Sequence, residues 1–130
     1  MSLRIGLIGT GKIAVANHIP GIRLSRDAEV TALCDPNPAA LAEASQATGV
    51  SRTYTDPFAL LKDAPVDAVI VATPNRFHRD IVVAAAESGR HVLCEKPLAL
   101  NVADARAMLK KLLAVTAISS LALLDRKSVV

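Results

Sequence analysis

Short apolar runs recur along the chain, separated by segments with a helical pattern. They lie at Arg4–Ile8, Val30–Cys34, Ala68–Ala72 and His91–Cys94. These runs are too continuous to leave one face in water, which is typical of parallel strands buried on both faces. Residues 51–55, SRTYT, fit a short strand at an edge of the sheet.

Helix-capping residues stand between the apolar runs. Three of them can accept hydrogen bonds from the first N–H groups of a helix: Asn37, Asp56 and Asn101. Gly49 and Gly89 stand where helices would end. Alternation of strand and helix produces right-handed crossovers and a sheet covered on both faces. The sequence therefore predicts an α/β fold, a Rossmann-type doubly wound parallel sheet with the first strand at its centre.

The loop after the first strand carries a dinucleotide fingerprint, the G-x-G-x-x-A of residues 9–14. Gly9 permits a tight turn, Gly11 lets the backbone approach a pyrophosphate, and Ala14 lets helix and strand pack closely. A turn without a ligand is the alternative, but the position between strand and helix favours a cofactor. We predict these cofactor-binding residues in the loop: Gly9, Thr10, Gly11, Lys12 and Ile13.

An acidic residue, Asp35, ends the second strand. Its separation from Gly11 is near that at which a carboxylate meets the adenosine ribose. A carboxylate accepts from the two ribose hydroxyls and repels a 2′-phosphate, and no arginine directly follows it. Asp35 therefore favours NAD and makes NADP less suitable. The alternative is an aspartate that only shapes a turn before Pro36.

Polar residues also follow the run Ala68–Ala72. Thr73 and Asn75 offer a hydroxyl and an amide at a strand end, where ligands bind in such sheets. His78 follows at the start of the next helix. We assign all three to cofactor binding, while for His78 an ordinary position on the helix rim remains equally open.

Composition narrows the class of protein. The 130 residues are 52% hydrophobic, so one domain with a buried core is expected. Two Phe, one Tyr and no Trp provide no stacking surface for nucleic acid, and the net charge of +3 is spread without a basic run. No signal peptide, membrane span or metal site is visible. We expect a cytoplasmic protein in which Cys34 and Cys94 are free thiols.

Four spaced motifs together resemble the Gfo/Idh/MocA family of NAD(P)-dependent oxidoreductases. They read RIGLIGTGKIA, ALCDPNP, VDAVIVATPNRFH and HVLCEKPLALNVADARAM, in order from residue 4 to about residue 112. The resemblance implies that Lys96 is catalytic and hydrogen-bonds the reacting oxygen of a sugar or polyol beside the nicotinamide. It places Glu95 at the nicotinamide ribose. Pro97 stiffens the backbone, and a cis Lys96–Pro97 bond is consistent with this role.

The resemblance ends before the end of the chain. Family members continue into a sixth strand and a larger α+β domain that supplies most substrate contacts, and they are expected to be homo-oligomers. In family members a glycine-containing turn leads into the sixth strand. The last residues of this chain resemble neither that turn nor that strand. We therefore expect residues 1–113 to form the dinucleotide-binding domain and 114–130 to be an atypical tail.

The final residues, 125–130, read DRKSVV and resemble a translated sequencing adapter. We interpret the chain as a fragment of a longer gene, inactive by itself; a genuine short protein is the alternative. Two functions follow as hypotheses. One is the NAD(P)-binding half of an oxidoreductase, and the other is a dinucleotide-binding module without chemistry.

Overall fold

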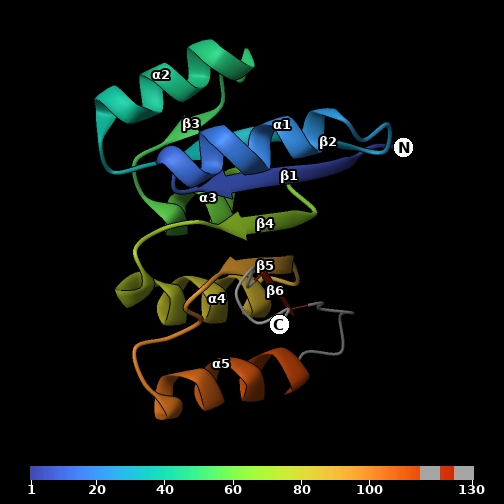
Figure 1. The fold of residues 1–130 in the computed structure, drawn as a ribbon. Coiled ribbons are helices and arrows are strands. Elements are labelled where there is room, and N and C mark those ends of the chain that lie inside the picture. The colour runs from blue at the N-terminus through green and yellow to red at the C-terminus, as the bar shows by residue number, and fades with distance from the viewer. Residues whose placement is uncertain (115–120, 125–130) are drawn as a thin grey trace, which may run out of the picture.

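The protein forms one parallel β-sheet with helices on both faces (Figure 1). The structure, a computed structural model, describes residues 1–114 and 121–124. Six strands pair in the order β3-β2-β1-β4-β5-β6. Their bounds are β1 Leu3–Ile8, β2 Ala28–Cys34, β3 Thr53–Tyr54, β4 Ala68–Val71, β5 His91–Glu95 and β6 Leu121–Leu124. The predicted α/β class, the edge strand and the central first strand are confirmed.

Helices divide between the two faces of the sheet. Their bounds are α1 Ile19–Arg23, α2 Pro38–Thr48, α3 Pro57–Asp63, α4 His78–Glu87 and α5 Val102–Ala114. Two short helices precede α1 and α4: a π-helix, η1 Ala14–His18, and a 3₁₀ turn, η2 Asn75–Phe77. Buried residues of η1, α1 and α2 share one core cluster, and those of α3, α4 and α5 share the other. Both faces are therefore sealed, which explains the continuous apolar runs.

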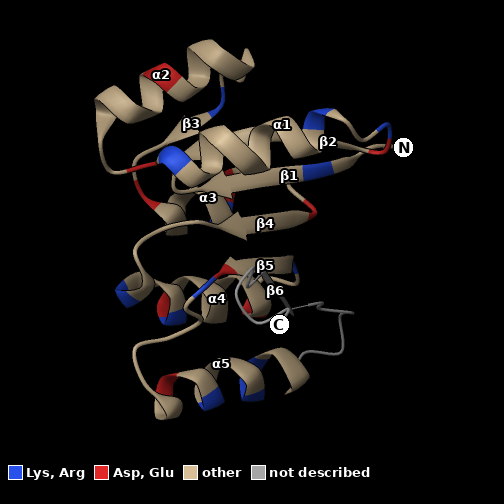
Figure 2. Cartoon of the chain, in the orientation of Figure 1, with Lys and Arg blue, Asp and Glu red and all other residues tan. Residues whose placement is uncertain are grey.

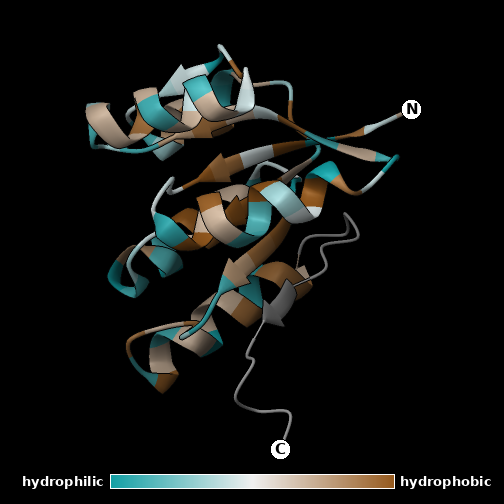
Figure 3. Ribbon diagram, turned by 45° about the horizontal axis from the view of Figure 1, so that its top comes forward, coloured by the Kyte–Doolittle hydropathy of each residue, from teal (hydrophilic) through white to brown (hydrophobic). Residues whose placement is uncertain are grey.

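Successive residues of a strand supply opposite clusters, as the pleat of a strand requires. Leu7 of β1 belongs to the cluster under α1 and α2, whereas Ile8 belongs to the cluster under α4 and α5. Leu33 and Cys34 of β2 divide in the same way. Figure 3 shows this inner layer as hydrophobic strands between helices of mixed colour.

The predicted caps lie where the sequence indicates. The Asn37 side chain accepts from Ala39 N at 3.0 Å, and Asp56 Oδ1 accepts from Phe58 N at 3.0 Å. Asn101 Oδ1 accepts from Asp104 N at 2.8 Å. Gly49 ends α2 in the left-handed region with a φ of 76°. The side-chain bonds satisfy backbone N–H groups that have no partner within the helix. They therefore fix the residue at which each helix begins.

The sequence-based view of the chain's last part needs one correction. We found no sixth strand in the sequence, yet Leu121–Leu124 pairs in parallel with β5, with Val92 opposite Leu121. A strand of four apolar residues without a turn signal cannot be recognised from its own sequence. It forms because it pairs with the exposed edge of β5. The adapter-like residues 125–130 lie outside the described residues, and the division at residue 113 stays a prediction.

Charged residues are distributed over several helices and strand ends (Figure 2). No helix among the described residues is both long and apolar enough to cross a membrane. Within the same part of the chain, no cluster of His, Cys, Asp and Glu is arranged to hold a metal ion.

Candidate functional site: the carboxyl edge of the sheet

A hollow of about 610 Å³ lies where β1, β2 and β4 end. The loops that follow these strands line it, since parallel strands bring their carboxyl ends to one edge. Six of its lining residues carry the argument below: Gly9, Gly11, Asp35, Phe58, Thr73 and Phe77. The sequence placed four of them at a cofactor site, and it did not assign the two phenylalanines.

The two glycines of the loop have different reasons to be glycine. Gly9 has a φ of 97°, and a Cβ there would lie 2.6 Å from Ala72 O. The fold itself therefore requires Gly9, as the predicted tight turn implies. A Cβ at Gly11 would meet nothing within 4 Å. Nothing in the protein excludes a side chain at Gly11, so the open space there fits a ligand that approaches the backbone.

Helical backbone begins directly after Gly11, at Lys12. The first helical bond runs from Val15 N to Gly11 O at 3.1 Å, so the amides of Lys12 and Ile13 precede the helical ladder. Both side chains are exposed. Ala14 is 1% exposed and packs in the core, as predicted for close contact of helix and strand. The loop thus presents two backbone donors at a helix N-terminus.

Asp35 is bonded to the glycine loop. Its Oδ2 accepts from Thr10 N at 2.9 Å and from Thr10 Oγ1 at 3.0 Å, while Oδ1 accepts from Asn37 N at 2.8 Å. The last bond is the turn that we considered as the alternative, so Asp35 does shape the chain before α2. The carboxylate also borders the hollow. A carboxylate has about four acceptor sites, so these bonds leave room for further donors.

Thr73 presents an unpaired polar atom in the wall of the hollow. Its Oγ1 is buried without a hydrogen-bond partner among the described residues. Such groups are uncommon in folded proteins and call for a partner. Asn75 follows at the start of η2 and is partly exposed. Together with the space at Gly11, this hydroxyl fits a polar ligand such as a dinucleotide.

His78 is a buried residue, so the interpretation of a helix-rim position is wrong. It is 1% exposed, and its ring is held on both sides by backbone carbonyls. Nε2 lies 2.8 Å from Thr73 O, and Nδ1 lies 3.0 Å from Pro97 O. His78 joins the loop after β4 to the loop after β5. A carbonyl oxygen only accepts, so a neutral ring donates to one of these carbonyls at a time. Because the buried ring has protein carbonyls beside both nitrogens, a direct contact with cofactor is not what this geometry favours.

Lys96 stands at the end of β5 with an exposed side chain. The Lys96–Pro97 peptide is cis, in line with the expectation. No hydrogen bond or ion pair joins the Lys96 ammonium to another described residue. The preceding residue, Glu95, is 14% exposed, and its Oε1 lies 2.6 Å from His18 Nε2.

Sequence reasoning missed His18. It lies at the end of η1, is 8% exposed, and reaches across the edge to Glu95 on β5. A single histidine in a helical segment has no distinguishing pattern. The π-turn that directs it is not visible from periodicity either, so no signal in the sequence could have found this pair.

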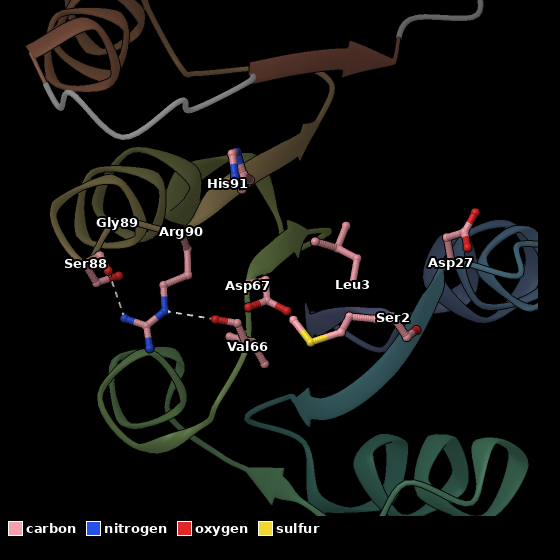
Figure 4. Close-up of a pocket in the computed structure, with 10 residues that line it drawn as sticks. Ser2, Leu3, Asp27, Val66, Asp67, Ser88, Gly89, Arg90 and His91 are labelled. Carbon is pink, nitrogen blue, oxygen red and sulfur yellow. Dashed lines mark hydrogen bonds between the residues drawn. The ribbon is translucent and has the colours of Figure 1, made fainter.

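A second hollow, of about 520 Å³, lies at the opposite, amino edge of the sheet (Figure 4). Asp67 borders it and binds Arg4 through both oxygens, at 2.8 Å and 3.0 Å. The Arg4 guanidinium lowers the pKa of Asp67 to about 2, chiefly by hydrogen bonding. Arg90, also in its wall, donates to Val66 O at 3.3 Å and to Ser88 O at 3.0 Å. The charged groups of Asp67 and Arg90 are therefore paired within the protein.

Both cysteines are free and buried, as predicted. Cys34 lies on β2 and Cys94 on β5, two strands that are not neighbours. Burial, the largest cause, raises the pKa of each thiol to about 12; Asp35 adds to this at Cys34 and Glu95 at Cys94. These thiols are small core residues rather than nucleophiles.

The fold and this edge define a dinucleotide-binding domain of the Rossmann type. More specifically, the chain belongs to the Gfo/Idh/MocA oxidoreductase family with its NAD-binding Rossmann fold, whose sequence profile matches residues 3–118. Myo-inositol 2-dehydrogenase of Thermotoga maritima is 38% identical over 109 residues, which are 84% of this chain and 32% of that protein.

Two further relatives support the same family. D-apiose dehydrogenase of Paraburkholderia graminis is 43% identical over 102 residues, covering 78% of this chain and 27% of that protein. The crystal structure of the WlbA dehydrogenase from Bordetella pertussis, in complex with NADH and UDP-GlcNAcA, is 35% identical, with a TM-score of 0.87. That match covers 95% of this chain and 35% of the other. The chain thus spans about a third of the length of such relatives.

Proposed function

We propose that this chain is the NAD-binding part of an oxidoreductase that transfers hydride between the nicotinamide and a sugar or polyol. The observation that carries the proposal is the hollow at the carboxyl edge, which Gly11 and Thr73 both line, with open space at Gly11 and a buried, unpaired hydroxyl on Thr73. Myo-inositol 2-dehydrogenase and D-apiose dehydrogenase, named for polyol and sugar substrates, support the substrate class.

The pyrophosphate would lie on the glycine loop, with the amides of Lys12 and Ile13 as donors. Asp35 would accept from the adenosine ribose hydroxyls, which favours NAD over NADP because a 2′-phosphate would approach a carboxylate. Phe58 and Phe77 are 48% and 44% exposed and both border the hollow. Their rings would shield the adenine from water. Thr73 and Asn75 would face the middle of the cofactor.

Lys96 would act on the substrate. NAD, when bound, supplies the hydride acceptor or donor. The ammonium of Lys96 donates a hydrogen bond to the reacting oxygen, which orients the substrate and stabilises negative charge that develops there. Lys96 is exposed directly after β5, the strand beside β4, which leaves it available for this contact.

Calorimetric titration of the chain with NAD⁺, NADH, NADP⁺ and NADPH tests cofactor binding. We expect the two NAD forms to bind and the two NADP forms to bind more weakly. Tighter binding of NADP⁺ and NADPH would contradict the role of Asp35, and absence of binding by all four would contradict the cofactor site.

A chimaera tests the role of Lys96. Residues 3–118 replace the matching segment of the Thermotoga maritima myo-inositol 2-dehydrogenase, whose remaining part supplies the rest of the enzyme. We expect Lys96→Ala to abolish turnover of this chimaera with NAD⁺ affinity nearly unchanged. Near-normal turnover would reject the proposed role, and an equal loss of NAD⁺ affinity would make Lys96 a cofactor-binding residue.

A second candidate function is dinucleotide binding without turnover. The observation in its favour is that no side chain within residues 1–114 is hydrogen-bonded to Lys96 as a second acid–base group. Under this hypothesis the chain binds NAD(H), and the chimaera turns over no substrate even though it folds and binds NAD⁺.

A further inference from the structure

The exposed Lys96 is flanked by residues that two buried histidines hold. On its amino-terminal side, Glu95 Oε1 lies 2.6 Å from His18 Nε2. On its carboxyl-terminal side, the carbonyl oxygens of Pro97 and Leu98 lie 3.0 Å and 3.2 Å from His78 Nδ1. The lysine itself has no hydrogen bond to a described residue. A short segment is thus held on both sides while its central side chain is left available.

The two histidines belong to helical segments that follow loops of the proposed cofactor site. His18 belongs to the helix that starts at the glycine loop, and η1 ends with it. His78 begins α4, and its Nε2 lies 2.8 Å from Thr73 O, the backbone oxygen of the residue with the unpaired hydroxyl. Both contacts therefore join the Lys96 segment to the loops that we propose for the cofactor.

The bond between His18 and Glu95 is short and largely shielded from water. The two side chains are 8% and 14% exposed, so solvent screens the interaction little. Hydrogen bonds to an ionised carboxylate are about twice as strong as those between neutral groups. The contact also crosses from the helix after β1 to β5, although β4 lies between these two strands. Sheet pairing alone does not provide this link.

The local helix geometry supports a specific purpose for His18. Residues Ala14–His18 form a π-turn, closed by the bond from Ile19 N to Ala14 O. Such turns occur frequently at functional sites, because the additional residue redirects a side chain. Here the redirected side chain is buried and polar, and it meets a carboxylate.

We propose that His18 and His78 are positioning residues, which hold the segment Glu95–Leu98 so that Lys96 meets the nicotinamide end of the bound cofactor. This inference rests on the proposed function. It predicts that loss of the His18 contact disturbs the nicotinamide end of the site more than the adenosine end. A merely structural role would weaken both ends together.

The test compares NAD⁺ with ADP-ribose, which lacks nicotinamide, by calorimetry on the full chain. We expect His18→Ala to reduce the affinity for NAD⁺ relative to ADP-ribose by roughly 3- to 10-fold, about one net hydrogen bond. His18→Gln places an amide nitrogen near the original Nε2 and should recover most of the ratio. The matched control is His91→Gln, since His91 is exposed at the opposite end of β5.

A spectroscopic measurement follows Lys96 directly. Lysines are labelled by reductive ¹³C-methylation, and the Lys96 signal is assigned with Lys96→Arg. In the unaltered chain NAD⁺ should shift this signal more than ADP-ribose does, and in His18→Ala the difference should shrink. If His18→Ala fails to fold, His18→Asn serves instead, because its shorter amide cannot reach Glu95.

The outcomes separate the inference from the proposed function. If both ligands bind and His18→Ala weakens them equally, or leaves ratio and lysine signal unchanged, the inference is wrong and the proposed function stands. If neither ligand binds the unaltered chain, the proposed function is wrong and the inference falls with it.

Discussion

The two edges of the sheet carry hollows of similar size, about 610 Å³ at the carboxyl edge and about 520 Å³ at the amino edge. Their polar groups differ. At the amino edge, Arg4 and Asp67 bind each other. Arg90 donates there to the backbone carbonyls of Val66 and Ser88 (Figure 4). At the carboxyl edge, Thr73 Oγ1 has no described partner, and Gly11 faces open space.

Two hollows of similar volume therefore differ in whether their polar groups are paired, so volume alone does not identify a binding site. Charged groups that pair with one another contribute to stability, whereas an unpaired hydroxyl in a residue that borders open space, such as Thr73, is available to a ligand. The comparison therefore makes opposite predictions for the two edges: changes at the carboxyl edge should alter binding, and changes at the amino edge should alter stability alone.

The largest expected effect is on the alkylation rate of Cys34, which tests whether the hollow at the carboxyl edge extends into the core. Cys34 borders the carboxyl hollow, but burial raises its pKa to about 12 from 9.0. At pH 8 the thiolate fraction is then far lower than for an ordinary thiol, and the side chain is 1% exposed. We expect slow alkylation of Cys34 by iodoacetamide in the folded chain and fast alkylation in denaturant, measured by mass spectrometry. Rapid reaction of the folded chain would show that the hollow opens into the core.

Gly11→Val should have the next largest effect, a loss of NAD⁺ affinity. We expect a loss of NAD⁺ affinity of about 100-fold or more, because the side chain fills the space proposed for pyrophosphate. Thermal stability should change little, since a Cβ there meets nothing within 4 Å. Calorimetry and circular dichroism measure the two effects.

Gly9→Val is the matched control for Gly11→Val. Its Cβ would lie 2.6 Å from Ala72 O at a φ of 97°, so this variant should lose stability by a few kcal/mol. If Gly11→Val folds and binds NAD⁺ normally, the loop is only a turn and the contrast between the edges disappears.

Asp35→Ala should have a smaller effect. The ratio of affinities for NADH and NADPH should fall by roughly 10-fold, because the ribose hydroxyls of NADH lose their hydrogen bonds to a charged carboxylate. The variant also removes the bonds from Thr10 and Asn37, so affinity for both cofactors should fall. The ratio of the two dissociation constants, measured on one preparation, cancels that common loss. An unchanged ratio would remove Asp35 from cofactor selection.

The smallest effect belongs to the amino edge. Asp67→Asn should lower the thermal midpoint by roughly 1–4 °C, as expected for an exposed ion pair. Because the pKa of Asp67 is about 2 in the folded chain and 3.8 for an ordinary aspartate, the stability that Asp67 contributes is present above about pH 4 and is lost as the pH falls toward 2. Stability curves of both chains should therefore converge at low pH. Any change in NAD⁺ affinity would contradict the division between the edges.

Most of the fold could be predicted from local signals. Asn37, Asp56 and Gly49 act through bonds to residues close in sequence, and continuous apolar runs report burial on both faces. β6 was missed because its pairing with β5 is non-local and its four residues have no pattern of their own.

The candidate site was predictable in part, for the same physical reason. The glycine loop and Asp35 belong to a spaced motif, so their positions at one edge follow from parallel strands. Three features that depend on residues distant in sequence could not be predicted. They are the bond of Asp35 to Thr10, the burial of His78 and the pair of His18 with Glu95. Each depends on side-chain direction in the folded chain, which periodicity does not report.

The π-turn at Ala14–His18 makes the number of residues in this helix matter as much as their identity. An α-helix turns by about 100° for each residue, so one deletion within the turn would rotate His18 away from Glu95 without changing any side chain in the pair. One insertion would rotate it in the opposite sense. Length variation should therefore be tolerated in the loop after α2 and selected against between Gly11 and His18. The number of residues between the glycine loop and His18 sets the direction of the histidine side chain. A substitution elsewhere cannot restore that direction once the number has changed.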